Sequence, residues 1–591
     1  MMPFEEHKLH EYLFRLLFSI SIIVIFYLSC IPVNASFPNQ EEFILINDIH
    51  SGMKGVGKTV FEGTKIEEFG VEVIDIIHGS GITYPYILVK LSGDRIENNG
   101  GISAGMSGSP VYFNGKLAGA ISHAWELSEH NLCLITPIDI MLTLLDYIGE
   151  GNQNVSFNPI VNNEKKNINF HYIQSPLIIN GFYGRADSLI KEKLKKYGIT
   201  VIQNISGYHD IKPELEIGTE IKKVQPGSAI GVQLSTGDIN IMGIGTATYC
   251  QDKYVLALGH PFMHRGDVSY LLTSVYIYHS FPSIVMPFKI GSPFLLLGEV
   301  IQDRNAGILA RLNKFPSIVS CKISVSDLDR NLENNAGVKV VPEKEIVESV
   351  VPALLIQTVD NTINRIGQGT GDIKLGFRNA DTGDVLNYNN IFYSENDIAV
   401  EISRDLNNIF DLLYYNFYEK IDLNEIVINV SIKKHINKAH IKKVILNTEN
   451  HFPGDEVEAE IIVTPFRQPD EKRTVQIKLP ENIAPGNAVL TVRGGLSKEI
   501  IGEQSISQEE ERYLLNGWDE IEKHLKEKEK NNQIIVEIIL FNDDNSSDSK
   551  IRSGKDNSEN NLKVILETDF VIDGYHEIFL DIKNRNIGEA E

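Results

Sequence analysis

The sequence predicts a mainly β protein made of several domains. Its 591 residues are enough for about three or four domains, and 42% hydrophobic with 23% charged residues is typical of a soluble globular chain. Most apolar runs are short, rich in Val, Ile, Tyr and Phe, and bounded by Asn-Gly, Pro-Gly or Gly-rich turns. Short strands separated by turns about every 8 to 12 residues favour barrels or sandwiches over helical bundles.

Residues 1–35 contain a long apolar run after a short charged segment. The run Leu16–Val33 follows Lys8 and Arg15 and ends in the small-residue pattern Val-Asn-Ala at 33–35. This pattern predicts a cleaved secretory signal peptide and therefore an exported protein, periplasmic or extracellular. An uncleaved membrane anchor is the alternative, because a run of this length nearly suffices to span a bilayer.

The charge and the cysteines exclude several classes of function. A net charge of −24 argues against a nucleic-acid partner, which would require clustered Lys and Arg to neutralise phosphates. Beyond the signal, Cys133, Cys250 and Cys321 are widely spaced and each lies in an apolar or strand-like run. An odd, isolated set predicts neither a disulfide framework nor a metal site, so we expect small core residues.

Five regions are expected after the signal. Periodic apolar positions predict helices at 342–366 and 398–415, alternating apolar positions broken by Pro-Gly predict sandwich strands, and the polar loop 542–561 is expected to be disordered. The expected regions are a barrel at 41–150, a second barrel at 168–324, a helical connecting region at 340–420, a β-sandwich-like domain at 425–495, and a charged helix, polar loop and terminal strands at 505–591.

Residues 52–59, GMKGVGKT, match the pattern of a phosphate-binding P-loop. A P-loop must open a helix whose N-terminus holds the phosphate. Here Val60–Thr64 contains β-branched residues and a glycine and leads into another strand-like run at 71–77. The context therefore predicts a strand and no nucleotide binding.

The stretch 100–125, GGISAGMSGSPVYFNGKLAGAISHAW, places Ser107 in a setting suited to nucleophilic attack. Gly105 and Gly108 flank it, and glycines permit backbone angles that direct neighbouring N–H groups at one point. An oxyanion hole needs this arrangement. Strand-like runs on both sides of Asn-Gly at 114–115 predict that the serine lies on a turn leading into a β-hairpin. The alternative is a Gly/Ser-rich hairpin turn with no chemistry.

This stretch resembles the second barrel of chymotrypsin-like serine peptidases, in which G-x-S-G-[GS]-P-V precedes an Asn-Gly turn and a strand that lines the specificity pocket. It resembles most closely the stage IV sporulation protein B family of serine peptidases, through GMSGSP, the following NGKLAGA and a nearby histidine, His123. The resemblance implies two chymotrypsin-like β-barrels and acyl-enzyme chemistry without a cofactor. It also implies that Gly105 and Ser107 donate the oxyanion-hole N–H groups, and that His123 and Trp125 line the substrate cleft.

The segment 243–266, GIGTATYCQDKYVLALGHPFMHRG, contains two strand-like runs that deliver His260 at the end of an apolar strand. Members of the resembled family carry a comparable strand ending in Ala-[Leu/Phe]-Gly-His, whose histidine is the general base, so His260 is the first candidate. In that family the histidine precedes the serine, whereas here it follows Ser107 by 153 residues. Because a triad is defined by geometry and not by chain order, we expect two barrels in permuted order. His123 is the alternative base, and a hydrogen-bonded turn histidine is the structural alternative for His260.

A serine and histidine pair works best when a third group fixes the imidazole tautomer. Asp94 is the first candidate, because it lies thirteen residues before Ser107 and members of the resembled family place their acid a similar distance upstream. The alignment requires a gap there, and Asp94 is equally well interpreted as a solvated turn residue. Asp75 and Asp139 are the substitutes.

Met106 occupies the position where some chymotrypsin-like enzymes have an acidic residue that binds a freed N-terminus on activation. Methionine cannot form that ion pair, so we expect any activity to be independent of it.

The sequence therefore predicts an exported serine endopeptidase with a specific protein substrate. If its N-terminal segment is not cleaved, that segment would attach the peptidase to the membrane. Family members cut specific signalling proteins, which implies narrow specificity. One alternative is a catalytically inactive peptidase-like scaffold that binds envelope proteins. Another is a metal site at His260, His264 and Asp267, disfavoured because His-x-x-x-His needs a helix and the glutamate of zinc peptidases is absent.

Overall fold

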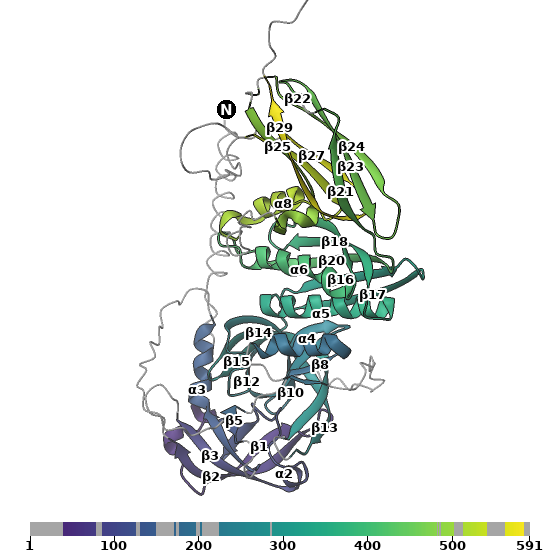
Figure 1. Ribbon diagram of the computed structural model, residues 1–591. Coiled ribbons are helices and arrows are strands. Elements are labelled where there is room, and N and C mark those ends of the chain that lie inside the picture. The colour runs from purple at the N-terminus through teal and green to yellow at the C-terminus, as the bar shows by residue number, and fades with distance from the viewer. Residues whose placement is uncertain are drawn as a thin grey trace, which may run out of the picture.

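In the computed structural model, the chain forms a stack with two β-barrels at one end, an α/β layer in the middle and a β-sandwich at the other end (Figure 1). The predicted signal segment and the polar loop 542–561 lie outside the described residues. The structure describes residues 40–77, 85–125, 130–148, 171–172, 177–196, 201–203, 224–283, 287–448, 450–481, 483, 486–500, 512–540 and 562–583.

The first barrel is a closed ring of six strands in the order β4-β1-β2-β3-β6-β5, closed because β5 also pairs with β4. The residues of the P-loop-like pattern run into β1, a strand, as predicted. The short strand β7 (His171–Tyr172) adds to β5 outside the ring. The elements are η1 (Gln40–Glu42), η2 (Ile46–Asp48), β1 (Lys54–Val60), β2 (Ile66–Ile77), β3 (Tyr86–Ser92), α2 (Asp94–Asn98), β4 (Pro110–Phe113), β5 (Lys116–Ala124), β6 (Leu132–Pro137), α3 (Ile138–Leu142) and η3 (Thr143–Tyr147).

The second barrel is also a closed ring of six strands, in the order β10-β13-β14-β15-β12-β11, with β11 pairing back onto β10. The mainly β fold with two barrels, serine unit first, agrees with the predicted permuted order. The elements are β8 (Leu177–Asn180), α4 (Gly184–Lys195), β9 (Val201–Gln203), β10 (Ala229–Gly237), β11 (Asn240–Gln251), β12 (Tyr254–Ala257), β13 (Gly266–Phe281), β14 (Phe288–Arg304) and β15 (Gly307–Leu312).

The α/β layer differs from the helical connection expected at 340–420. Two strands lie between its helices, and the sheet order β19-β18-β20-β16-β17 continues into the second barrel through pairing of β17 with β10. Residues 319–324, expected in the second barrel, belong to this sheet as part of β16. The elements are β16 (Val319–Asp327), β17 (Leu332–Val340), α5 (Lys344–Ile363), β18 (Gly369–Asn379), β19 (Val385–Ser394), α6 (Ile398–Tyr414) and β20 (Leu423–Lys433).

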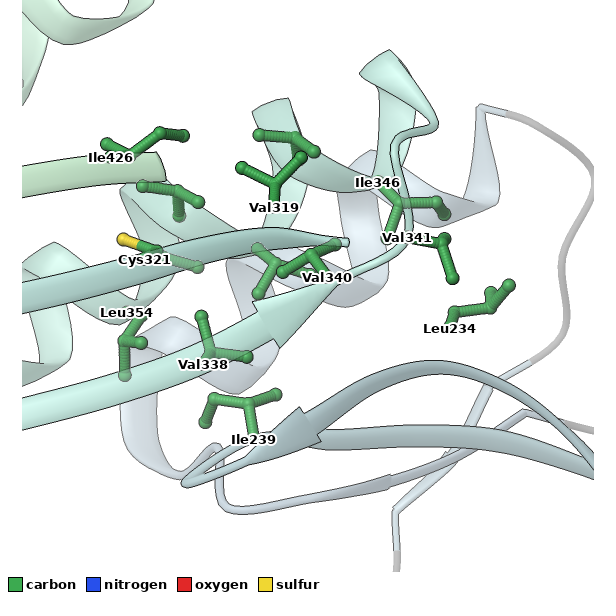
Figure 2. Close-up of a cluster of buried hydrophobic side chains, with 14 of the residues drawn as sticks. Leu234, Ile239, Val319, Cys321, Val338, Val340, Val341, Ile346, Leu354 and Ile426 are labelled. Carbon is green, nitrogen blue, oxygen red and sulfur yellow. The ribbon is translucent and has the colours of Figure 1, made fainter. Parts of the chain in front are cut away.

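Helix α5 is the centre of the largest core. It packs on β16 and β17 with one side and on α4 with the other, and Figure 2 shows Val340, Val341 and Ile346 at the point where strand, turn and helix meet Leu234 of the second barrel. It is long and apolar enough to cross a membrane, yet 83% of its most apolar stretch is buried within the protein. We therefore interpret α5 as a core helix that joins the second barrel to the α/β layer.

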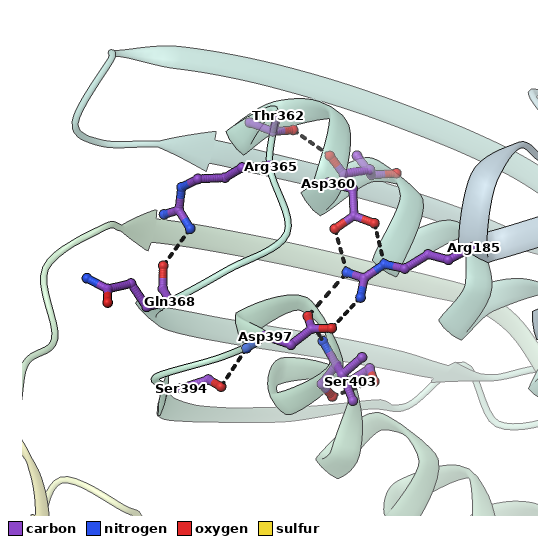
Figure 3. A network of polar contacts seen from close by, with 10 residues as sticks. Arg185, Asp360, Thr362, Arg365, Gln368, Ser394, Asp397 and Ser403 are labelled. Carbon is purple, nitrogen blue, oxygen red and sulfur yellow. Dashed lines mark hydrogen bonds and ion pairs between the residues drawn. The ribbon is translucent and has the colours of Figure 1, made fainter.

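One arginine ties α4 to the two helices of this layer. Arg185 of α4 donates to both carboxylate oxygens of Asp360 on α5, at 2.6 and 2.5 Å, and also pairs with Asp397 (Figure 3). Asp397 is the N-cap of α6 and accepts the Val400 N–H at 3.3 Å. Bidentate pairing fixes the guanidinium geometrically, so α4, α5 and α6 are held in one arrangement.

The β-sandwich extends further along the chain than expected. Its two sheets have the orders β24-β23-β21-β28 and β22-β29-β25-β26-β27, so the terminal strands expected as a separate region complete it. Strand β20, expected in the sandwich, instead pairs with β18 and β16. The elements are β21 (Lys438–Leu446), β22 (Asn450–His451), β23 (Glu456–Pro465), β24 (Glu471–Lys478), β25 (Gly486–Gly494), η5 (Gly495–Ile500), α8 (Gly517–Glu527), β26 (Gln533–Leu540), β27 (Leu562–Glu567), β28 (Val571–Asp573) and β29 (Tyr575–Ile582).

The two barrels meet at Gly108, next to the candidate serine. Its φ is +92°, and a Cβ there would lie 1.9 Å from the Thr246 carbonyl oxygen and 2.6 Å from the Leu258 nitrogen. Only glycine therefore fits where the first barrel approaches strand β11 and the end of β12.

Gly108→Ala is expected to lower the free energy of unfolding by about 3–5 kcal/mol, because left-handed strain adds to a backbone overlap. Gly115→Ala is the matched control, since Gly115 has φ +77° but no atom within 4 Å of the new Cβ. It should cost only about 1–2 kcal/mol. Urea unfolding of the two variants measures the difference, and equal losses would contradict close contact at Gly108.

Candidate functional site

Ser107 lies in a tight loop just before β4. The Met106 N–H donates to the Ser103 carbonyl at 2.9 Å, the Ser109 N–H donates to the Met106 carbonyl at 2.9 Å, and the Gly108 N–H donates to the Ile121 carbonyl at 2.8 Å. Gly105, with φ +98°, adopts an angle that L-residues rarely reach. These bonds fix the backbone around the buried serine.

Strand β11 of the second barrel holds the other side of this loop. The Thr246 N–H donates to the Ser107 carbonyl at 2.8 Å, and the Thr246 hydroxyl donates to the Gly105 carbonyl at 3.0 Å. The Thr248 hydroxyl donates to the Gly108 carbonyl at 2.7 Å. The serine loop is therefore shaped by both barrels and not by its own barrel alone.

His260 lies at the same interface, directly after β12 and the turn Leu258–Gly259. The Gly259 carbonyl accepts the Thr136 hydroxyl of the first barrel at 2.6 Å. The imidazole is 2% exposed, and its Nδ1 lies 2.7 Å from the Pro261 carbonyl oxygen. Because a carbonyl oxygen can only accept, Nδ1 carries the proton and Nε2 is the unprotonated nitrogen, as in an imidazole that acts as a general base.

His123 on β5 is the second buried imidazole of this interface. Its Nδ1 lies 2.7 Å from the Ser122 hydroxyl, and its ring meets that of Tyr86 edge-on at 4.8 Å. Burial, and then the charge of His260, lower the pKa of His123 to about 3. His123 is therefore neutral at physiological pH, and a proton on it is strongly disfavoured.

Asp303, at the end of β14, organises the loop that follows His260. Its buried carboxylate accepts the N–H groups of Phe262 and Met263, each at 2.7 Å, and that of Arg265 at 3.4 Å. Burial raises the pKa of Asp303, while these backbone donors counteract the rise. Asp303 was not among the residues predicted from the sequence, where the available signal was an acidic residue inside a long, mostly apolar strand.

None of the three carboxylates considered as the third member of a triad has a described hydrogen bond to His123 or His260. Asp94 is exposed at the start of α2, just after β3 ends at Ser92. Ile87 lies at the level of the serine hairpin, and Ser92 is five residues, or about 16 Å, further along β3. Asp75 is exposed and accepts its neighbour's N–H at 2.8 Å. Asp139 is half-buried on α3, and its Oδ1 has no hydrogen-bond partner among the described residues.

The remaining expectations concern the edge of β5, the thiols and metals. Trp125 is half-buried at the end of β5, and the neighbouring edge at His123 and Ala124 pairs antiparallel with β7. Burial raises the pKa of Cys250 and of Cys321 to about 12, so both thiols stay protonated. Within the described part of the chain, no cluster of three His, Cys, Asp or Glu side chains could hold a metal ion.

No curated protein and no solved structure matches the chain. Residues 32–133, which include β1 to β5 of the first barrel with the serine loop and its hairpin, match the family model described as SpoIVB peptidase S55, so the resemblance drawn from GMSGSP is confirmed over that part of the chain.

Proposed function

We propose that the protein is a serine endopeptidase in which Ser107 is the nucleophile and His260 the general base. The observation that carries the proposal is the junction of the barrels, where the serine loop contacts β11 and the backbone that leads into His260. The family match over the first barrel supports peptidase chemistry. A serine hydroxyl becomes a useful nucleophile when a neighbouring imidazole takes its proton, and here both groups sit on fixed backbone.

The hydrogen bond from His260 Nδ1 to the Pro261 carbonyl substitutes for a triad carboxylate. In the usual triad an aspartate accepts the Nδ1 proton and fixes the tautomer. A carbonyl fixes the tautomer equally but supplies no negative charge to stabilise the imidazolium. We therefore propose a serine and histidine pair that works without Asp94.

His123 is less suited to be the base than His260. A base must hold a proton during acylation, and the pKa of about 3 that burial and the charge of His260 impose on His123 opposes this. We propose that His123 lines the substrate cleft with Trp125, and that the N–H groups of Gly105 and Ser107 receive the oxyanion.

The proposed substrate is an extended segment of a protein. The edge of β5 next to the serine loop can pair with an antiparallel strand, as its pairing with β7 at His123 and Ala124 shows, and a substrate segment would take the place of β7 there. Main-chain pairing along such an edge suits a peptide in extended form. We propose further that the protein is exported, and attached to the membrane where its N-terminal segment is not cleaved.

The direct test is labelling of the protein by a fluorophosphonate probe. Ser107→Ala should abolish labelling, and His260→Ala should slow it by at least about 10³-fold, because the base is lost. Ser109→Ala is the matched control, because its hydroxyl is buried two residues away without a hydrogen-bond partner among the described residues, and it should label normally.

Each other outcome points elsewhere. Labelling that His260→Ala leaves intact and His123→Ala removes would move the base to His123. A folded wild type that is never labelled would contradict the proposed peptidase and favour the inactive scaffold that binds envelope proteins.

Asp303→Asn should lower the labelling rate by about tenfold, because the new amide N–H₂ faces backbone donors and releases the loop after His260. Asp267→Asn is the matched control, since Asp267 makes an exposed ion pair with Arg304 at 3.0 Å. Labelling rates measured on both variants test the role, and an equal effect of the two would refute it.

A further inference from the structure

Lys289, near the start of β14, is a buried lysine in contact with the serine loop. It is 2% exposed. Its backbone N–H donates to the Ala104 carbonyl at 3.0 Å, and the neighbouring Pro287 carbonyl accepts the Ala104 N–H at 2.7 Å. The hairpin of β13 and β14 therefore reaches from the second barrel and pairs with the chain just before Gly105.

The side chain of Lys289 reaches the same loop. Its Nζ donates to the Thr59 hydroxyl at 2.8 Å and to the Gly105 carbonyl at 3.5 Å, and it lies 5.9 Å from the centre of the Phe61 ring. The Gly105 carbonyl is also the acceptor of the Thr246 hydroxyl. Two donors from the second barrel thus converge on one carbonyl of the serine loop.

No carboxylate balances this amine among its described contacts. Two titratable residues lie on the strands beside Lys289, Lys58 on β1 and His279 on β13. Each directly precedes a buried residue, Thr59 or Ser280, so strand alternation turns its side chain to the face away from Lys289. β11 presents Ile244 and Thr246, and the serine loop itself has no titratable side chain near Gly105. Burying a lysine is costly, and burial lowers the pKa of Lys289 to about 7. A structural gain must offset that cost.

Lys289 fixes the orientation of the two peptide units on either side of Gly105. A trans peptide is planar, so its C=O and N–H point in opposite directions. Because the Lys289 N–H holds the Ala104 carbonyl, the Gly105 N–H of the same peptide unit points away from β14. The bonds of Lys289 Nζ and Thr246 to the Gly105 carbonyl fix the following peptide unit as well.

We propose that Lys289 is a positioning residue that holds the two peptide units around Gly105, so that the Gly105 N–H stays directed at the oxyanion formed on attack by Ser107. The inference rests on the proposed peptidase function. The backbone of Lys289 fixes the unit before Gly105, and its Nζ fixes the unit after it together with Thr246. The residue touches no substrate and acts through the loop alone.

Lys289→Met tests the side chain, because it keeps the backbone N–H and an unbranched apolar stem of similar size and removes the amine. The maximal rate of fluorophosphonate labelling should fall about 3- to 10-fold while the probe concentration at half-maximal rate stays unchanged, since only the developing oxyanion is affected. Lys253→Met, at an exposed lysine of the second barrel, is the matched control. A change in probe affinity with an unchanged maximal rate would overturn the proposal.

A double-mutant cycle separates positioning from general support. Lys289→Met and Thr246→Val each leave one donor on the Gly105 carbonyl, whereas the pair leaves none, so the combined loss should exceed the product of the single losses by at least about tenfold. The Thr248 hydroxyl donates to a different carbonyl, that of Gly108. The losses of labelling rate in Lys289→Met and Thr248→Val should therefore multiply in the double variant. Multiplicative losses in both cycles would overturn the shared role at Gly105.

Stability gives a check on the burial of Nζ. The pKa of Lys289 is about 7 in the folded chain against 10.5 for an ordinary lysine. The unfolded chain therefore binds more protons between these values, and stability rises with pH across that window. The melting temperature of the wild type should rise relative to that of Lys289→Met between pH 7 and pH 10, and a constant difference would contradict the buried amine.

Hydrogen exchange tests the same role without any activity. In Lys289→Met, amide exchange in residues 103–109, followed by mass spectrometry, should accelerate about tenfold, while Lys253→Met should leave it unchanged. Unlabelled wild type with accelerated exchange in Lys289→Met would refute the peptidase but retain the positioning role. Unchanged exchange would refute the positioning role whatever the labelling shows.

Discussion

The approach of the two barrels at the serine loop is the constraint on which the candidate site depends. Strand β11 binds the carbonyls of Gly105, Ser107 and Gly108, so three acceptors of one short loop are satisfied by the other barrel. A buried carbonyl without a donor costs about 1–3 kcal/mol. The loop conformation that suits an oxyanion hole is therefore stable only when the second barrel is in place. The geometry of the candidate site and the barrel interface are therefore one structural feature.

This contact does not depend on which barrel comes first along the chain. The serine loop and the histidine turn meet across an interface, and neither strand order nor chain direction enters the geometry of their contact. A permutation moves the connection between barrels but leaves β11 beside the loop. What the chain must conserve is the close fit at Gly108 and the turn that carries His260.

The sequence was informative wherever the structure is local. The turn around Ser107, the Asn-Gly hairpin, the strand nature of the P-loop-like run and the strand before His260 depend on neighbouring residues, and all could be predicted. The partner of β20 could not, because its alternating pattern fits a sandwich sheet as well as the α/β layer. The distance from Ser107 in residues favoured Asp94, yet β3 carries the chain away from the hairpin before α2 begins. Asp303 and Lys289 were missed because a charged residue in a strand pattern normally faces solvent.

Those two buried charges share one strand, and that placement connects the halves of the candidate site. Lys289 near the start of β14 contacts the serine loop, and Asp303 near its end binds the loop that follows His260. Four register shifts along the β13 and β14 pair bend this hairpin around the barrel, since bulges curve and twist strands. The serine loop and the loop after His260 are therefore both held by strand β14. A buried lysine and a buried aspartate are each unfavourable alone, and their retention at the two ends of β14 is explained by the backbone groups that they hold.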